Sequence, residues 1–380
     1  MKTGQSPRET PKAAPARPSS RIMLDSLTAV RGPAALLVFG YHVIHGTQWA
    51  NWIPGARLGY VGVSLFFILS GFVLAWSYNK NAGAKSFYLR RFARVYPLHF
   101  FFYCVALMGL LLFGVSNSAG DLNPLSALLN LVLLQAWVPS WEVIFSNNAV
   151  SWSLSCEAFF YLMTPFVLNR LDGMRYRVKA ALLGGWFLLM ATVSYILAAQ
   201  SNFMDVVVYA NPLLRSGEFA LGLALGLFAL MVRDGYRVPV IRGYHCLAMI
   251  TLALGAMYVS SKFYLLQTAH GLLLAPVWAV LILVLALWDI RRSTMPREKN
   301  LFWKAAVIAG EASFAFYLVH ELVLAYVRSA PLAASAHGGI TGLLYVVISL
   351  IIASILALLA HYFIERPAHR FIVKKYSQKV

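Results

Sequence analysis

The chain has 380 residues, of which 60% are hydrophobic and only 12% are charged, and its mean hydropathy is +0.68. Soluble globular proteins carry about 25% charged residues, so this composition predicts a membrane protein. A formal net charge of +18 is also typical of proteins that bind nucleic acid, but here the basic residues lie between apolar stretches, which excludes nucleic acid as a partner.

The N-terminal residues 1–22 are rich in Pro, Ala, Ser and charge, which predicts a disordered cytoplasmic tail. This tail is not a signal peptide, because the apolar run after it is too long and lacks a cleavage pattern of small residues. Residues 23–370 are expected to form one membrane domain, and residues 371–380 a basic cytoplasmic tail. No connection between apolar stretches is long enough for a soluble catalytic domain, so any chemistry must take place in the membrane domain.

Ten apolar stretches are long enough to cross the hydrocarbon core of a bilayer, which takes about 20 residues of α-helix. They cover approximately residues 27–45, 60–78, 96–115, 152–169, 178–198, 212–232, 244–260, 266–288, 305–327 and 340–364. A shorter run, residues 122–138, is expected to be interfacial or re-entrant. The predicted fold is therefore all-α, a polytopic transmembrane helical bundle of about ten spans.

The distribution of basic residues predicts the orientation of this bundle. If both termini lie in the cytoplasm, 27 of the 32 lysines and arginines fall in cytoplasmic segments, as the positive-inside rule requires. A full crossing by residues 122–138 would turn the later basic connections outward, which disfavours that alternative. The three cysteines, Cys104, Cys156 and Cys246, show neither metal-ligand nor disulfide spacing and are interpreted as packing residues.

Two ionisable residues, Arg31 and His42, lie inside the first apolar stretch. Eleven steps of about 100° bring His42 back to within roughly 20° of Arg31 on the helix surface, about 16 Å further along. Ionisable groups at membrane depth are costly and usually line a cavity or a pathway. We therefore expect both side chains to face one interior, and we interpret His42 as functional.

The segment after the second apolar stretch contains Arg91 and Arg94, three residues apart at the start of a helix. Such a pair projects from one helix face, and two guanidinium groups are suited to phosphate oxygens. A phosphorylated cytoplasmic donor would explain the pair, and so would an anchor on lipid phosphates.

Further ionisable residues occur in later spans. Glu157 lies about 9 Å into a span that enters from outside, which matches the depth expected for His42 in the outer half of its own span. Arg215 and Glu218 share a helix face and are interpreted as a structural ion pair. The outer half of the stretch 305–327 carries His320 and Glu321, so several ionisable groups are expected to meet at one level. This pattern is typical of an active site, a proton relay or a structural ion-pair network.

At the inner end of the last span, His361 and Glu365 are interpreted as anchors of the helix. Arg366 and Pro367 are expected to end it.

Taken together, these motifs resemble the membrane acyltransferase 3 family, and they occur in the order expected for it. The matching elements are Leu24-Asp25-Ser26-Leu27, Arg31 followed after ten residues by His42, residues 63–72, the Arg91-x-x-Arg94 pair, Trp152-Ser-Leu-x-x-Glu157, Arg215-Ser-Gly-Glu218, Ser313 to His320 with Tyr317, and Tyr362 to Pro367. They cover nearly the whole of residues 24–367, and their joint order is specific although no single motif is decisive.

The resemblance implies a ten-span enzyme of the bacterial inner membrane, with residues 23–370 as its acyltransferase domain. Such an enzyme moves an acyl group, usually acetyl, from cytoplasmic acyl-CoA to a hydroxyl, with no permanently bound cofactor and no metal. Acceptors in the family include cell-envelope and exported carbohydrates, and also small metabolites such as macrolides.

The residues and the resemblance together suggest a mechanism. Arg91 and Arg94 would bind the phosphates of acyl-CoA, and His42 would act as general base on the acceptor hydroxyl or take the acyl group itself. Glu157 would orient or charge-balance His42, and Arg31 would guide the donor or stabilise developing negative charge. The remaining candidate site residues are Arg215, Glu218, Tyr317 and His320.

Two other classes stay open. A proton-coupled transporter could use His42, Glu157, Arg215 and Glu218 as a relay and substrate site, although no inverted repeat is obvious and the Arg91 and Arg94 pair has no particular role there. A non-catalytic membrane sensor or scaffold would require no chemistry of His42.

Overall fold

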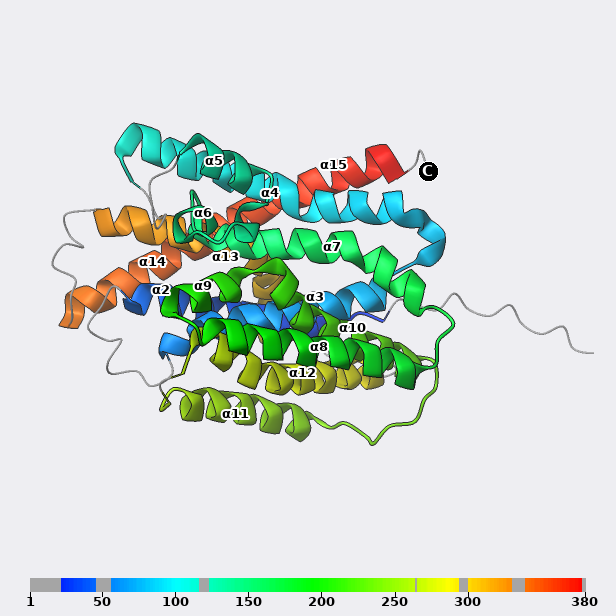
Figure 1. Cartoon of the computed structure of the whole chain (residues 1–380). Helices are drawn as coiled ribbons and strands as arrows, with labels where there is room; N and C mark the ends of the chain where they lie inside the picture. Colours follow the sequence, from blue (N-terminus) through cyan, green and yellow to red (C-terminus); the bar gives the residue numbers. More distant parts are fainter. Residues whose placement is uncertain are drawn as a thin grey trace, which may run out of the picture.

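The computed structural model describes residues 22–45, 56–115, 123–263, 265–293, 300–329 and 339–377. The predicted disordered tail lies outside these residues, except for Ile22. Within the described segments the regular elements are helices, and no strand occurs among them. The prediction of an all-α, polytopic bundle is therefore confirmed (Figure 1).

Each of the ten predicted spans forms a helix. They are α2 (Arg31–His45), α3 (Gly62–Ser77), α4 (Gly83–Phe113), α7 (Trp152–Leu171), α8 (Tyr176–Ala198), α10 (Pro212–Arg233), α11 (Gly243–Ser260), α12 (Gln267–Arg292), α13 (Leu301–Ser329) and α14 (Gly339–Ala360). Nine helices in the described part of the chain are long and apolar enough to cross a membrane. The predicted span at residues 152–169 is not among these nine, although α7 has 20 residues, because it carries more polar side chains.

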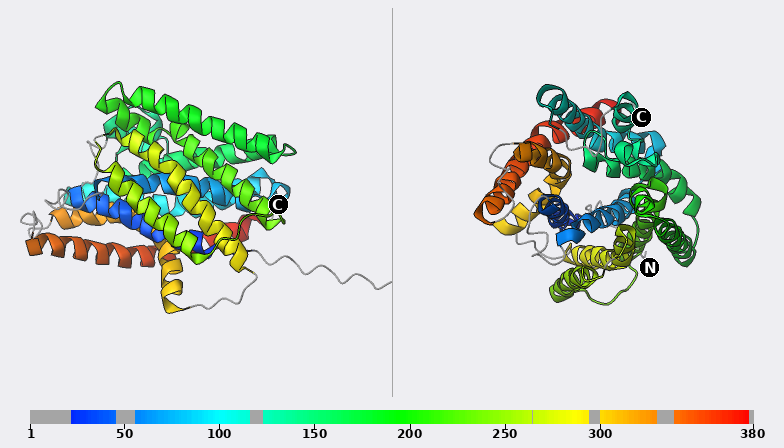
Figure 2. Two further views of the ribbon diagram at one scale, coloured as in Figure 1. Left: turned by 90° about the horizontal axis from the view of Figure 1, so that it is seen from below. Right: turned by 60° about the vertical axis from the view of Figure 1, so that its left-hand side comes forward.

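Helices α2 and α3 occupy the middle of the bundle, and the other long helices surround them (Figure 2). In the span that contains α3, 89% of the most apolar stretch is buried, whereas the corresponding value for α11 is 11%. Helix α11 therefore lies at the periphery, where its apolar side chains are suited to lipid. Helix α2 packs along α13, and α3 packs against α10.

A bonded contact between distant segments sets the position of α2. Helix α1 (Asp25–Ala29) precedes α2, and the backbone N–H and hydroxyl of Ser26 both donate to the carboxylate of Asp289 near the end of α12, each at 2.7 Å. On the other side, the backbone of Thr28 lies against Gly310 of α13, so close that a Cβ atom on Gly310 would overlap the carbonyl oxygen of Thr28. These contacts hold the first span between α12 and α13.

The segment between α4 and α7 does not form a helix long enough to cross a bilayer. It consists of the short helices α5 (Pro124–Leu131) and α6 (Trp141–Ile144) with turns between them. The buried amides of Asn130 and Gln135 donate to the backbone carbonyls of Ser146 and Ser151 at 2.7 and 3.1 Å. Irregular backbone at membrane depth is tolerated where protein groups satisfy it, so this segment agrees with the expected interfacial or re-entrant run.

The end of the last span differs from the prediction. Arg366 and Pro367 do not end the helix, because α14 continues through a π-helical turn, His361–Glu365, into α15 (Arg366–Ser377). Proline lacks an N–H and clashes with the carbonyl four residues earlier in an α-helix. The wider π turn directly before Pro367 accommodates this defect, and α15 then runs beside α4 (Figure 1).

Candidate active site

A cavity lies between α2, α3, α4, α7 and α13. Its polar lining comes from Arg31 of α2, Arg94 of α4, Glu157 and Tyr161 of α7, and Tyr317 of α13, together with Ser153 and Ser313. The centres of water molecules can occupy about 60 Å³ of this cavity. A single water needs roughly 10–15 Å³ by this measure, so the cavity has room for a few waters.

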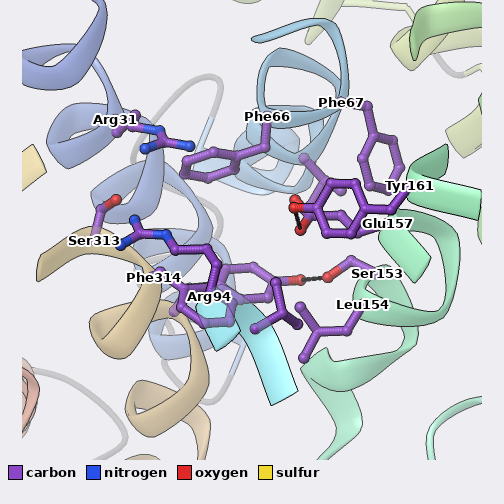
Figure 3. A pocket seen from close by; sticks show the side chains of 13 residues that line it. Arg31, Phe66, Phe67, Arg94, Ser153, Leu154, Glu157, Tyr161, Ser313 and Phe314 are labelled. Carbon is purple, nitrogen blue, oxygen red and sulfur yellow. Dashed lines mark hydrogen bonds between the residues drawn. The ribbon is translucent and has the colours of Figure 1, made fainter. Parts of the chain in front are cut away.

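Opposite charges face each other across the cavity. The guanidinium groups of Arg31 and Arg94 lie on one side, and Glu157 and Tyr161 lie on the other (Figure 3). The Tyr161 hydroxyl donates to the Glu157 carboxylate at 2.7 Å, within one turn of α7. When Arg91 and Glu365, which lie next to the cavity, are included, three guanidinium groups and two carboxylates surround it, and this excess of positive charge favours an anionic ligand.

Arg94 pairs with a carboxylate outside the cavity lining, Glu365 of the π turn. The other oxygen of Glu365 lies 2.8 Å from Nδ1 of His361, and Arg366 pairs with Glu311 of α13 at 2.5 Å. These groups form a polar network that joins α4, α13 and the end of α14. The prediction that His361 and Glu365 anchor the last span agrees with this network, but Glu365 also contacts a residue of the cavity.

The other arginine of the pair, Arg91, does not line the cavity. Its guanidinium lies over the rings of Phe87 and Tyr161, at 5.7 and 6.0 Å from their centroids. Its buried Nε has no hydrogen-bond partner within the described residues. The structure therefore places Arg91 behind Tyr161, next to the cavity wall, and Arg94 in the cavity itself.

A second cluster of ionisable groups surrounds His42. Its Nδ1 lies 3.1 Å from Nε2 of His320 and 3.9 Å from the carboxylate of Glu321. The other carboxylate oxygen of Glu321 accepts a hydrogen bond from Arg328 at 3.0 Å. The side chain of His42 is 24% exposed, whereas His320 is fully buried. Potential ligand atoms of His42, His320 and Glu321 lie within 4.8 Å of one another, so these three residues could hold a metal ion.

The expected position of Glu157 beside His42 is wrong. Its carboxylate lies in the cavity near Arg31, and Glu321 is the carboxylate beside His42. The reason is the depth at which α7 begins. The amide of Asn148 donates to the carbonyl of Leu318 at 3.0 Å, so the chain entering α7 is already deep in the bundle. Glu157 lies nine residues further on.

One stripe of α13 connects the cavity with the His42 cluster. Ser313 and Tyr317 line the cavity, and His320 follows one turn later on the same face. The Ser153 hydroxyl donates to the Tyr317 hydroxyl at 3.0 Å, and the ring of Tyr317 lies 5.9 Å from that of His320. Since Arg31 and His42 both face this stripe, the prediction that they share one interior is confirmed.

The remaining predicted pair lies in the core beside α3. Arg215 and Glu218 are 3.0 Å apart, and Arg215 also donates to the Ser64 hydroxyl at 3.1 Å. The guanidinium lies 5.0 Å from the ring centroid of Phe67, one of the aromatic residues of the cavity wall. The predicted ion pair is confirmed, and neither of its members lines the cavity.

Three polar residues of the cavity, Ser153, Tyr161 and Ser313, were not among the predicted site residues. Tyr161 follows Glu157 by four residues and so shares its helix face, a signal that could have identified it. Ser153 carries no such signal, because a serine at the start of a helix is common in many contexts.

Comparisons with known proteins identify the family. The acyltransferase domain of the acyltransferase 3 family matches residues 24–362. Acyltransferase MdmB from Streptomyces mycarofaciens is 32% identical over 327 residues, which cover 81% of each protein. Two more distant relatives are the putative peptidoglycan O-acetyltransferase YrhL from Bacillus subtilis and the O-acetyltransferase OatA from Staphylococcus aureus. Both are 24% identical, over 94% and 93% of this chain.

The alignments cover 56% of YrhL and 60% of OatA, so this chain spans little more than half the length of these two relatives. No solved structure matches the chain. The family match nevertheless extends over every element of the site, from Arg31 through His42, the cavity and the α13 stripe to His361 of the π turn. The chain is therefore a multi-pass membrane protein that belongs to the acyltransferase 3 family.

Proposed function

We propose that this protein is an O-acyltransferase of the bacterial inner membrane that moves an acetyl group from cytoplasmic acetyl-CoA to a hydroxyl of a carbohydrate. The observation that carries the proposal is the arrangement along α2. A cavity with excess positive charge lies near the Arg31 end, and a partly exposed histidine lies about 16 Å further along the same face.

The end of the cavity at Arg94 is proposed to receive the donor. With both termini in the cytoplasm, Arg91, Arg94 and the basic helix α15 lie on the cytoplasmic side, where acyl-CoA is available. Guanidinium groups bind phosphate through charge-assisted hydrogen bonds. The phosphates of CoA would compete with Glu365 for Arg94, and the pantetheine arm would pass Ser313 and Tyr317 on its way to His42.

His42 is proposed as the general base. It takes the proton of the acceptor hydroxyl while the acceptor oxygen attacks the thioester carbonyl carbon. When the C–S bond breaks, the imidazolium returns this proton to the sulfur of CoA, so the products are the ester and CoA. Arg31 would guide the donor through the cavity, and Glu157 would hold Arg31 and Tyr161 in place across it.

The acceptor class is supported by the names of two relatives. YrhL is named a putative peptidoglycan O-acetyltransferase and OatA an O-acetyltransferase. A peptidoglycan fragment is a carbohydrate with free hydroxyls, and we propose an acceptor of this class for the present chain.

The proposal is tested with purified protein in lipid nanodiscs and radiolabelled acetyl-CoA. CoA release and label transfer are followed with and without a panel of sugar acceptors, peptidoglycan fragments and a macrolide alcohol. Wild type is compared with His42→Ala and with His245→Asn, a matched control at the start of the peripheral helix α11. We expect acceptor-dependent CoA release that His42→Ala abolishes and His245→Asn retains.

The other results would each change the assignment. If label were transferred only to the macrolide alcohol, the proposed acceptor would be a small metabolite instead of a carbohydrate. Label retained without acceptor on wild type but not on His42→Ala would indicate that His42 is itself acylated. If acetyl-CoA neither bound nor turned over with any acceptor, the acyltransferase proposal would fail and a transporter would become the leading interpretation.

A further inference from the structure

We infer that His320 and Glu321 are positioning residues that hold His42 with its proton on Nδ1, so that Nε2 is the nitrogen that accepts the proton of the acceptor. This inference deepens the proposed function and rests on it for the identity of the reaction. The assignment of the ring nitrogens rests on geometry alone.

The first step concerns His320. Its Nδ1 lies 3.2 Å from the backbone carbonyl oxygen of Phe316, one helical turn earlier. A carbonyl oxygen can only accept, so Nδ1 of His320 must carry a hydrogen. A neutral imidazole has one N–H, and therefore Nε2 of His320 presents a lone pair toward His42.

The second step concerns His42. Its Nδ1 lies 3.0 Å from the carbonyl oxygen of Val38 and 3.1 Å from Nε2 of His320. The carbonyl of Val38 and the lone pair of His320 both require a donor, so the two acceptors together hold the hydrogen of His42 on Nδ1. If His320 carried a second proton, its N–H would face the N–H of His42. The two histidines are therefore both neutral, and the lone pair of His42 is on Nε2.

The third step concerns Glu321, whose two oxygens have different surroundings. One oxygen accepts a hydrogen bond from Arg328 at 3.0 Å, which fixes the orientation of the carboxylate. The other is buried, has no hydrogen-bond partner within the described residues, and lies 3.9 Å from Nδ1 of His42. When His42 accepts a proton at Nε2, the imidazolium forms beside this carboxylate, which stabilises the charged form.

A metal ion is the competing explanation for two histidines and a carboxylate this close together. Two contacts disfavour it. Nδ1 of His42 faces the oxygen of Val38, so this nitrogen carries a hydrogen and has no lone pair for a metal. The guanidinium of Arg328 also lies against the carboxylate and would repel a dication. The contacts therefore favour a hydrogen-bonded cluster in which the carboxylate and His320 orient the base.

The test begins with a measurement that does not depend on turnover. Protein with ¹⁵N-labelled histidine is studied in nanodiscs by NMR, and the signals of His42 are identified by their loss in His42→Ala. We expect the Nδ1–H tautomer in wild type, and no metal bound in stoichiometric amount. The Nε2–H tautomer, or one tightly bound divalent ion per chain, would overturn the inference whatever the enzyme does.

The variants test each positioning residue. Glu321→Gln should lower kcat by about 10-fold with little change in the KM for acetyl-CoA, because the imidazolium loses its neighbouring negative charge. The exposed Glu142→Gln in α6 is the control and should leave kcat unchanged. His320→Gln keeps an acceptor for Nδ1 and should retain the wild-type tautomer, whereas His320→Leu should yield a mixture. Equal behaviour of the two His320 variants, or an unchanged kcat in Glu321→Gln, would contradict the inference.

Turnover measurements then separate the two proposals. Loss of one of the two acceptors for Nδ1 in His320→Leu should lower kcat by about 10- to 100-fold with little change in the KM for acetyl-CoA. His320→Gln should recover most of this loss. If the NMR results are as expected but wild type shows no turnover, the proposed function fails and the assignment of the nitrogens stands.

Discussion

The crossing of α3 and α10 gives a stability prediction that can be worked from the structure. At this crossing, a Cβ atom on Gly222 would overlap the backbone carbonyl oxygen of Ile68, and one on Gly71 would overlap that of Phe219. Small residues allow membrane helices to approach closely in this way. We therefore expect Gly222→Ala to destabilise the protein by forcing the two helices apart.

The magnitude follows from two opposing effects. Overpacking typically costs about 1–3 kcal/mol, and the upper value applies at Gly222 because a backbone carbonyl cannot rotate away. Alanine also gains about 1 kcal/mol of helix propensity over glycine. The expected net loss is about 2 kcal/mol. At Gly255 of α11 nothing lies within 4 Å of the added Cβ, so Gly255→Ala should gain about 0.5–1 kcal/mol.

The two alanine variants are compared by the free energy of unfolding of purified protein in bicelles, titrated with SDS and followed by tryptophan fluorescence. The prediction is that the variants shift the unfolding midpoint in opposite directions. A Gly222→Ala protein as stable as wild type would refute the reasoning, since the close contact would then not limit the packing of α3 on α10.

Four further expectations can be checked separately. Asp289→Ala should lower the free energy of unfolding by about 3 kcal/mol, because two charge-assisted hydrogen bonds to α1 are lost, and an unchanged SDS midpoint would contradict this. A membrane-permeant maleimide should modify the partly exposed Cys104 faster than the buried Cys156 and Cys246, as mass spectrometry would show; equal rates would be incompatible with the packing. Glu157→Gln should reduce acetyl transfer by about 10- to 100-fold without loss of folded protein, whereas full activity would remove Glu157 from the site. Reporter fusions at the two ends should both be active in the cytoplasm, and a periplasmic signal at either end would reverse the topology.

The long helices could be predicted from the sequence because the thickness of the bilayer sets their length. Each predicted apolar stretch corresponds to a helix, including residues 152–169, whose polar side chains weaken the hydropathy signal. The common face of Arg31 and His42 was predictable for a similar reason, because the rise and turn of one helix decide it.

The residues that these side chains contact depend on how the helices pack against one another, and local sequence patterns carry no information about that packing. The predicted depth of Glu157 is wrong because it assumes that α7 begins at the membrane surface. Asn148, just before α7, already contacts α13 inside the bundle. Glu321 therefore replaces Glu157 beside His42. The prediction that the last helix ends at Arg366 and Pro367 is wrong, because proline breaks a regular α-helix but the chain forms a π turn directly before Pro367.

The π turn at His361–Glu365 also determines how α15 is rotated relative to α14. A π turn contains one residue more than an α turn. If the same residues formed a regular α-helix instead, everything after the turn would be rotated by about 100° and shifted by about 1.5 Å. Helix α15 would then turn its present face away from α4, and Glu365 would no longer point at Arg94. The one extra residue in this turn therefore sets the face that α15 presents to the rest of the bundle.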